Sequence, residues 1–475
     1  MPFSLLGGMD VRTGEQIVFH VDKISSDGSG IARGEDGMVV FIPGALPGET
    51  VLGRITVKKR EYAIAEPEEI LSPSPGRIAP LCPWYGKCGG CQLQHASYGL
   101  QLKLKELMVH DAFQRIYKGQ YPSGFSCAPS PEEWRYRNKA SFPVRTISGK
   151  PRPGFFARRS HELVPVDRCP LISSDLEAAF RSISSFLPSL GIQAYDERTG
   201  KGAIRHLILR HGLATGDVLA SLVLKGSLRA SSRQGIGEVL LPALKKAVPG
   251  LRTLTLNRND AESNVIVGET SEALWGDGLV EEAMGRLRFR YDTTSFFQVN
   301  ALQAFRMYEY AAGKAVCSPE DTVLELYSGI GTLTAFLAGA GSHVTAVEEW
   351  PRAVERMEEN LRLNGLDDRV TILPGAAETY APSLRGKFRS VLLDPPRTGC
   401  NEQVLRWICG LGPERIVYVS CNPATLARDG ALLGKQGYFP EDMACFDMFP
   451  QTVHVETVVL FERSRTGQAS GTLEG

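Results

Sequence analysis

The sequence has no surplus of charge of either sign. Lys and Arg together number 53, and Asp and Glu together also number 53, so the 475-residue chain is formally neutral. Proteins that bind phosphate backbones usually carry a basic excess, so the overall charge gives no support to a nucleic-acid partner. A neutral total still allows a basic face that an acidic face balances, so such a partner is not excluded.

A leader-like start and long apolar runs are also missing. The first residues lack a charged stretch followed by a long apolar one, and charges interrupt the apolar segments elsewhere well short of a membrane span. The sequence therefore predicts a cytoplasmic protein that does not enter a membrane. Because that compartment is reducing, we expect some of the ten cysteines to bind metal or to take part in chemistry instead of forming disulfides.

The length suggests about three domains of roughly 150 residues each. We expect a multidomain protein with a disordered tail over 465–475. The expected domains are a small OB-like β-barrel over 12–70, a central α+β domain over 75–292 that carries a metal cluster, and a Rossmann-like α/β domain over 293–464. A Pro- and Ser-rich linker over 71–80 separates the first two.

Short alternating segments at the N-terminal end predict the strands of the barrel. Turns with Gly and Pro separate them at Asp27–Gly30 and Pro43–Gly48. The basic run Lys58–Arg60, next to Tyr62, either meets RNA or is a solvated turn. The predicted strands are Gln16–Val21, Gly37–Ile42, Thr50–Val57 and Tyr62–Glu66.

This N-terminal segment resembles a TRAM domain, an oligonucleotide-binding barrel attached to RNA-modifying enzymes. The segments Asp27–Ala32, Val40–Ala45 and Gly48-Glu49 carry the likeness. The resemblance implies that this part of the chain binds RNA.

A group of cysteines follows the linker. Cys82, Cys88 and Cys91 form a C-x5-C-x2-C pattern with glycines between them, and Cys169, followed by Pro170, is the best candidate for a fourth ligand. Four thiolates suit zinc or an iron–sulfur cluster, and a distant Cys-Pro favours a [4Fe–4S] cluster. The C-x3-C-x2-C spacing of radical enzymes is absent, so the cluster would be structural or would contact RNA. Cysteines that merely lie near a turn are the simpler alternative.

From residue 297 onward, apolar strands alternate with helices. The alternation predicts a parallel sheet with right-handed crossovers. The pattern gives a helix over Ala301–Ala315 and strands over Thr322–Leu326, Val344–Glu348, Val370–Leu373, Ser390–Leu393 and Arg415–Val419.

A glycine-rich turn, Tyr327–Thr332, follows the first of these strands. Its two glycines allow a ligand to approach the backbone at the carboxyl edge of the sheet, and Glu348 at the end of the next strand can accept both hydroxyls of a ribose. Thr334 stands where a dinucleotide-binding motif has its third glycine. S-adenosylmethionine, which has no pyrophosphate, therefore fits the turn; a glycine turn in a cofactor-free fold is the alternative.

Two further strand ends bring reactive groups to the same edge. Asp394 begins an Asp-Pro-Pro segment, and Cys421 lies in Ser-Cys-Asn-Pro after the next strand. A thiolate that adds to C6 of uracil activates C5 toward a methyl donor, and a base must then remove the C5 proton. Glu456 is the candidate base, with an exposed strand residue as the alternative, and His454 is expected to support packing or to contact RNA. Cys421 could otherwise be an ordinary buried cysteine.

These segments together resemble the RNA (uracil-5-)-methyltransferase family over nearly the whole chain. The likeness rests on the barrel, the cysteine pattern, Ser295–Asn300, the glycine turn, Asp394–Arg397, Ser420–Pro423 and His454–Thr457. It implies that Cys421 is the nucleophile and Glu456 the base. It also implies S-adenosylmethionine binding by Gln298, Tyr327, Thr332, Glu348 and Asp394, and a [4Fe–4S] cluster on Cys82, Cys88, Cys91 and Cys169.

The chain departs from the family in small ways: Ser328 stands where many relatives have cysteine, and Thr332 where some have asparagine. The residue that contacts the adenine, near Ala377, is not assigned. Members with both barrel and cluster usually modify large-subunit ribosomal RNA, so we expect a monomeric 23S rRNA uridine-C5 methyltransferase that flips its target base.

The alternatives are a transfer-RNA target, another base or a small molecule, and an inactive RNA-binding protein. The segment Trp134–Lys139 either stacks bases and clamps phosphates or is an ordinary alternating strand.

Overall fold

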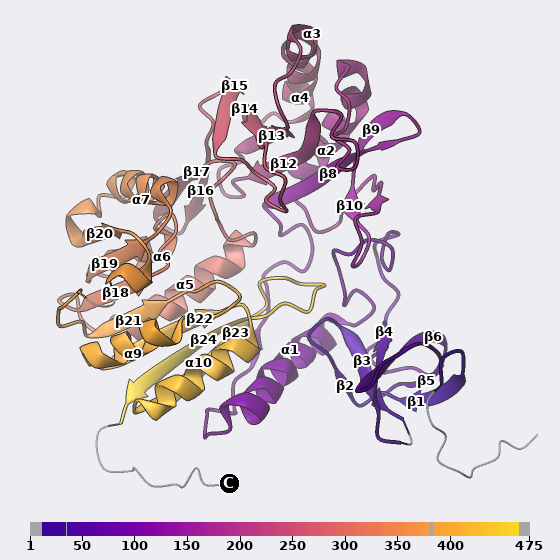
Figure 1. Ribbon diagram of the computed structural model, residues 1–475. Helices are drawn as coiled ribbons and strands as arrows, with labels where there is room; N and C mark the ends of the chain where they lie inside the picture. Colours follow the sequence, from indigo (N-terminus) through magenta and orange to yellow (C-terminus); the bar gives the residue numbers. More distant parts are fainter. Residues whose placement is uncertain (1–11, 35, 381–382, 465–475) are drawn as a thin grey trace, which may run out of the picture.

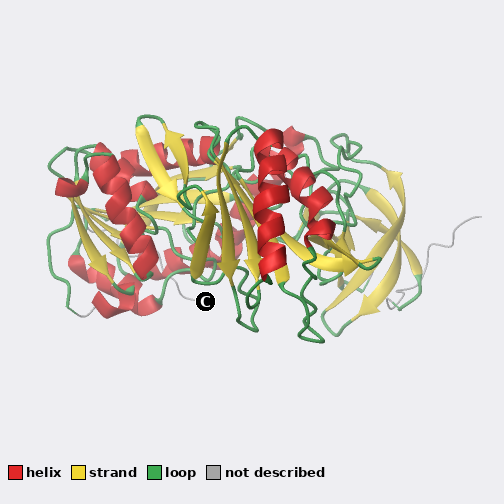
Figure 2. Ribbon diagram, turned by 90° about the horizontal axis from the view of Figure 1, so that it is seen from above, coloured by secondary structure: helices red, strands yellow, loops and turns green. Residues whose placement is uncertain are grey.

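The computed structural model describes residues 12–34, 36–380 and 383–464. Three units make up the molecule, as Figure 1 shows: an N-terminal barrel, a central sheet and a C-terminal sheet with helices on both faces. Seen from above, the barrel and the C-terminal unit lie at opposite ends, with the central sheet between them (Figure 2). The tail expected over 465–475 lies outside the described residues.

The N-terminal unit is a six-stranded sheet in the order β1-β5-β6-β4-β3-β2 that closes around a small apolar core. The four predicted strands are present, but β3 occupies a segment that the sequence reading assigned partly to a turn. Gly30 lies inside β3 and not in a turn. A Cβ at this position would lie 2.8 Å from Val21 Cγ1, so glycine is needed there for close packing. The strands are β1 Gln16–His20, β2 Lys23–Ile24, β3 Ser29–Arg33, β4 Val39–Pro43, β5 Thr50–Lys58 and β6 Tyr62–Ser72.

The central sheet has the order β15-β14-β13-β12-β8-β9, and α2, α3 and α4 cover one of its faces. Its strands are β8 Lys139–Ile147, β9 Lys150–Pro153, β12 Ile204–His211, β13 Val218–Leu224, β14 Leu251–Arg258 and β15 Thr270–Trp275. Two hairpins extend this unit, β10 Phe155–Phe156 with β11 Leu163–Val164, and β16 Val280–Met284 with β17 Leu287–Tyr291. The covering helices are α2 Ser174–Phe186, α3 Ala230–Gly235 and α4 Leu241–Ala247.

The C-terminal sheet has the order β20-β19-β18-β21-β22-β24-β23-β7. The strands from β20 to β22 are parallel, as the alternating pattern predicted, and β24 runs antiparallel to both of its neighbours. The predicted strands and the helix Ala301–Ala315 are all present, with ends that agree to within one residue. The strands are β18 Thr322–Leu326, β19 His343–Glu348, β20 Val370–Pro374, β21 Ser390–Leu393, β22 Arg415–Ser420, β23 Tyr438–Phe446 and β24 Glu456–Arg463.

Helices cover both faces of this sheet. On one face lie α5 Ala301–Ala315, α6 Thr332–Gly339 and α7 Pro351–Leu363, which share an apolar core with the sheet. On the other face lie α8 Ala377–Tyr380, α9 Glu402–Leu411 and α10 Pro423–Lys435. The carboxyl ends of the parallel strands therefore form the free edge where the sequence placed the candidate site.

A segment ahead of the central sheet belongs structurally to the C-terminal unit. Helix α1, Tyr98–Ala112, continues as a wide turn to Tyr117, and its Val109 and Phe113 are buried against α10. Strand β7, Cys127–Ala128, then pairs with β23 as the edge strand of the C-terminal sheet. The prediction from the sequence placed this segment in the central domain. A domain built from two separate stretches of the chain has no local sequence pattern that would reveal it.

A small apolar cluster joins the barrel to the C-terminal unit. Ile24 and Leu46 of the barrel pack with Leu93, Leu104 and Val453, which come from the cysteine region, α1 and the C-terminal unit. None of the described helices is long and apolar enough to cross a membrane.

Candidate active site

The glycine-rich turn joins β18 to α6 and has a left-handed backbone at three positions. Tyr327 has a φ of 66°, Gly329 of 58° and Gly331 of 80°. A Cβ on Gly331 would lie 2.5 Å from Met357 Cγ, so only glycine allows α7 to pass this close. Thr332 begins α6 with 8% of its surface exposed. The turn thus places its backbone at the carboxyl edge of the sheet, between the end of β18 and the start of α6.

Glu348, at the end of β19, holds this turn through hydrogen bonds. The Gly329 amide donates to Glu348 Oε2 over 2.7 Å, and the Trp350 amide donates to Oε1 over 2.8 Å. The carboxylate is 7% exposed and therefore has a fixed position beside the glycines. This is the place that the sequence assigned to a group that accepts ribose hydroxyls.

Buried carboxyl groups gather along the same edge. Burial raises the pKa of Asp394 to about 7. Burial, with Asp394 and Glu348 nearby, raises the pKa of Glu325 to about 8, and Glu325 Oε2 lacks a hydrogen-bond partner among the described residues. Burial and Asp394 also raise the pKa of Glu456 well above its usual range. Carboxyl groups whose pKa values are raised in this way suit a cationic ligand, because a nearby positive charge favours their ionised forms.

Cys421 is the first residue after β22, and Glu456 is the first residue of β24, its antiparallel neighbour. The pairing of Ser420 with Thr457 sets the two residues at adjoining ends of these strands. Burial raises the pKa of the Cys421 thiol to about 11, with Glu456 and Asp394 adding to the rise and Arg397 opposing it. The structure therefore brings the predicted nucleophile and base together, with a guanidinium that favours the thiolate.

Gln298 and His454 border the same region. The Asn138 side chain donates to the Gln298 carbonyl over 3.0 Å, which ties this segment to the start of β8. Arg397 Nη2 and His454 Nδ1 lie 3.1 Å apart, and burial together with Arg397 lowers the pKa of His454 to about 4. His454 is thus a neutral ring beside Arg397 at ordinary pH, and the expectation that it supports packing or contacts RNA stays a prediction.

Tyr308, on α5, is a residue of this site that the sequence reading missed. Its side chain hydrogen-bonds with Gln298, and burial raises the pKa of its hydroxyl, with Asp394 and Glu456 adding to the rise. The sequence offered no signal for this role, because a tyrosine on the inner face of a helix has the pattern of any core residue.

The four candidate metal ligands line one cavity of about 100 Å³ between the cysteine loop and the segment after β11. Burial is the main cause of a raised thiol pKa at Cys88, Cys91 and Cys169, with neighbouring thiols of the group adding to it, and that of Cys88 rises to about 11. The donor set suits a metal that prefers thiolates. Among the described residues, however, no three His, Cys, Asp or Glu side chains are arranged as a ready metal site. The ligands that line the cavity are Cys82, Cys88, Cys91 and Cys169.

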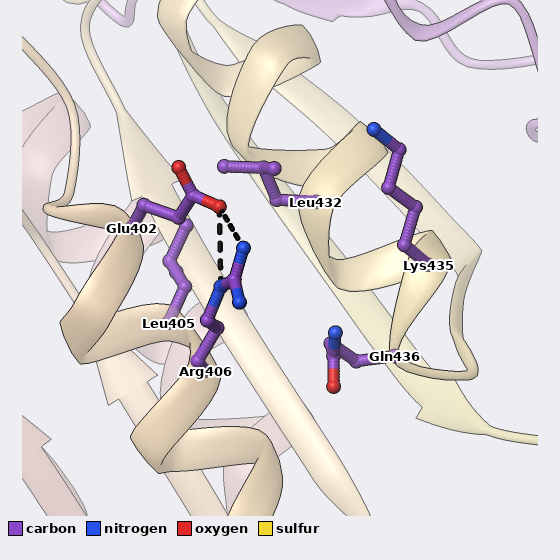
Figure 3. A pocket seen from close by; sticks show the side chains of 6 residues that line it. All are labelled: Glu402, Leu405, Arg406, Leu432, Lys435 and Gln436. Carbon is purple, nitrogen blue, oxygen red and sulfur yellow. Dashed lines mark hydrogen bonds and ion pairs between the residues drawn. The ribbon is translucent and has the colours of Figure 1, made fainter.

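A second hollow lies between α9 and α10 (Figure 3) and has a volume of about 70 Å³. Glu402 and Arg406 form an ion pair at its wall, with Leu432 and Lys435 opposite. None of the candidate catalytic, cofactor or metal residues lines it, so we assign it no part in the chemistry.

The sheet order and the glycine turn define a methyltransferase-type α/β domain, and the comparisons agree. Residues 280–464 match the tRNA (Uracil-5-)-methyltransferase family, and residues 11–67 match the TRAM domain. An uncharacterised RNA methyltransferase of Halalkalibacterium halodurans is 36% identical over 95% of this chain and 98% of its own length. One from Caldanaerobacter subterraneus is 38% identical over 95% of this chain and 99% of its own.

The chain therefore belongs to the RNA (uracil-5-)-methyltransferase family and carries an N-terminal TRAM domain. Its fold is also that of the Pyrococcus abyssi tRNA (uracil-54, C5)-methyltransferase solved with S-adenosyl-L-homocysteine. The TM-score is 0.74, with 24% identity over 94% of this chain and 100% of that one. The family resemblance inferred from the motifs is confirmed.

Proposed function

We propose that the protein transfers a methyl group from S-adenosylmethionine to C5 of a specific uridine in RNA. The observation that carries the proposal is the meeting of Cys421, Glu456 and Asp394 at one edge of the sheet. A cysteine and a buried carboxyl group are the two reactive groups that C5 methylation through a covalent adduct requires.

The cofactor residues would be Gln298, Tyr327, Thr332, Glu348 and Asp394, the set implied by the motifs. When bound, S-adenosylmethionine supplies an electrophilic methyl group on a sulfonium. The carboxyl groups at this edge fit the cation, because a positive charge would return their raised pKa values toward the usual range.

The chain's own residues would then act in sequence. The Cys421 thiolate, favoured by Arg397, adds to C6 of the uracil, and the electron pair moves to the C5–C4–O4 enolate, whose C5 takes the methyl group. Glu456 removes the proton from C5, the C5=C6 bond forms again, and the C6–S bond breaks to release the thiolate. Burial suits Glu456 to this step, because a raised pKa makes its carboxylate a stronger base.

We further propose that the substrate is 23S ribosomal RNA and that the protein acts as a monomer. The support is the combination of a TRAM barrel with a four-cysteine cavity, which is typical of family members that modify large-subunit RNA. Transfer RNA is the second candidate, because the family matched by residues 280–464 is described by a transfer-RNA activity.

Mapping of 5-methyluridine in cellular RNA tests both the reaction and the target. Cells that lack this gene are expected to lose the mark at one or two sites of 23S rRNA, because the modification depends on this enzyme. Wild-type protein restores the mark and Cys421→Ala does not. The measurement is mass spectrometry of digested ribosomal and transfer RNA from the two strains.

Each other outcome of the mapping has a definite meaning. Loss of a transfer-RNA mark alone would replace the ribosomal target with the second candidate. Persistence of every 5-methyluridine, together with no methyl transfer by purified protein to total RNA from the deletion strain, would contradict the uridine assignment. Cys317→Ala is the matched control, since Cys317 is exposed and lies outside both the active site and the cysteine cavity.

We propose that Cys82, Cys88, Cys91 and Cys169 hold a [4Fe–4S] cluster of structural or RNA-contacting type, with zinc as the alternative. Protein purified without oxygen is expected to contain iron and sulfide and to absorb broadly in the visible range. Cys88→Ala should remove most of the iron, while Cys317→Ala retains it. Zinc without iron in the wild-type protein would contradict the cluster and favour a four-thiolate zinc site.

A further inference from the structure

Three cations meet on the face of the central sheet opposite α2–α4. In β8 and β12, Ala140 and Leu209 point into the helix-covered core, so their neighbours Lys139 and Arg210 point to the other face. Lys139 and Arg210 stand directly opposite each other in the antiparallel pair. Arg137 precedes Lys139 by two residues and adds a third positive charge. We call Arg137, Lys139 and Arg210 the cation cluster.

The charges of this cluster are only partly compensated. Arg210 is 1% exposed and donates to the carbonyls of Thr293 and Ser295, and its guanidinium lies 5.3 Å from the centre of the Tyr291 ring. Asp292 adds a favourable charge to it. Even so, the Nε atoms of Arg137 and Arg210 are buried without a hydrogen-bond partner among the described residues.

Among the described residues, Lys139 lacks such compensation. Arg210, burial and Arg137 together lower its pKa to about 7, and the described part of the chain contributes no carboxylate that opposes this shift. Like charges directly opposite each other in a sheet are destabilising, and a buried cation ordinarily has a paired anion. Lys139 is nevertheless only partly buried, so an anion from solution can reach it.

The cluster lies between the two candidate sites. Arg137 lines the cysteine cavity and also acts electrostatically on His454, next to Arg397. Arg210 holds the carbonyl of Ser295, three residues before Gln298, and the intervening Phe296 side chain is 68% exposed. An anion bound at Lys139 would therefore be held beside the segment that leads into the active site.

We propose that the cation cluster binds a phosphodiester of the RNA substrate close to the target uridine, with Lys139 as its direct ligand. The proposal rests on the proposed function, since it takes RNA as the substrate. Arg137 and Arg210 act behind Lys139 by keeping the local field positive. In the free protein the repulsion between these cations is unfavourable, and the bound phosphate relieves it. Functional sites often carry such a cost in stability.

Replacement of Lys139 with methionine separates this role from a structural one. The variant is expected to bind RNA about 10-fold more weakly, the loss of one charged hydrogen bond. Its affinity should fall less steeply with salt concentration, by about one unit in the logarithmic slope. Because repulsion from Arg210 and Arg137 is removed, its Tm should rise by about 2–4 °C. Inorganic phosphate should raise the Tm of the wild type more than that of the variant.

The control is Lys150→Met, which removes an exposed lysine of β9 outside the cluster. Equal RNA affinity and salt dependence in the two variants would overturn the proposal. A fall in the Tm of Lys139→Met would also overturn it, by giving Lys139 a structural role. If Lys139→Met bound S-adenosylmethionine more weakly and RNA equally well, the proposal would also be overturned. The anion that Lys139 binds would then be the carboxylate of the methyl donor and not an RNA phosphate.

A separate readout distinguishes failure of this proposal from failure of the proposed function. At saturating concentration, RNA with 5-fluorouridine at the target should be trapped covalently by both wild type and Lys139→Met, because both proteins retain Cys421. Absence of the adduct in the wild type would contradict the proposed function. An adduct in both proteins with no difference in RNA affinity would contradict only the phosphate site.

Discussion

Replacing Glu456 with glutamine is expected to lower the turnover rate by about 10²- to 10⁴-fold, the usual contribution of a general base. The same variant should accumulate RNA that is bound covalently through Cys421. Glutamine cannot accept the C5 proton, so the methylated adduct forms but does not release the thiolate. Because Glu456 is buried and its pKa is raised by burial and by Asp394, a neutral amide of similar shape should leave the fold unchanged. Denaturing gels with unmodified RNA and S-adenosylmethionine would detect the adduct.

Two comparisons make this expectation specific. Glu456→Gln combined with Cys421→Ala should form no adduct, and Glu456→Gln without S-adenosylmethionine should accumulate far less, since the unmethylated adduct can reverse. A matched substitution at Glu462, on the same strand β24 but at its far end, should leave turnover unchanged. Normal turnover in Glu456→Gln would assign the base to another group.

Much of the C-terminal unit could be predicted from the sequence because local patterns determine it. The strand Thr322–Leu326 and the helix Ala301–Ala315 follow from apolar patterns, and the turn follows from glycines that tolerate its left-handed backbone. The strand ends at Asp394 and Cys421 fall at one edge because parallel strands with right-handed crossovers leave no other choice. Glu456 joins them because β24 inserts beside β22, a pairing that the sequence analysis did not predict.

Long-range packing accounts for what the sequence reading missed. Strand β7 has two residues and lies far along the chain from β23, so its pairing has no local signal. Tyr308 enters the site through the docking of α5, not through a motif. The segment before β8 does not form the alternating strand considered for it: Arg135 has a φ of 59°, and the Arg135 and Arg137 amides bond to carbonyls next to Cys169.

The loop that leads into β24 is held by another set of contacts that only the fold reveals. The Lys105 ammonium of α1 lies 2.5 Å from Asp447 Oδ1, with both side chains fully buried, and it also donates to the Phe449 carbonyl. Gln101 and Gln451 exchange two hydrogen bonds, of 3.0 and 2.8 Å. Gln451 has a φ of 71°, a strained backbone that persists only where its surroundings impose it. Helix α1 thus fixes the approach to Glu456.

Replacing Lys105 with methionine is therefore expected to cost about 3–5 kcal/mol of unfolding free energy. The loss arises because Asp447 would remain buried without a counter-charge, and its Oδ2 already lacks a partner among the described residues. Urea denaturation followed by circular dichroism measures the change. Lys103→Met, an exposed lysine of the same helix, should be nearly neutral and is the matched control.

A second substitution separates a lost pair from an uncompensated charge. In Lys105→Met combined with Asp447→Leu, both charges are replaced by apolar groups, and most of the lost stability should return, since buried ion pairs contribute little net stability. The turnover rate of the double variant should nevertheless be lower than that of the wild type. The reason is that Asp447 also accepts a hydrogen bond from the Phe449 amide and so orders the loop before Glu456. If stability and turnover both recovered in the double variant, the Lys105–Asp447 pair would hold the fold without positioning Glu456. If Lys105→Met alone were as stable as the wild type, the prediction that Asp447 needs Lys105 as its buried counter-charge would be wrong.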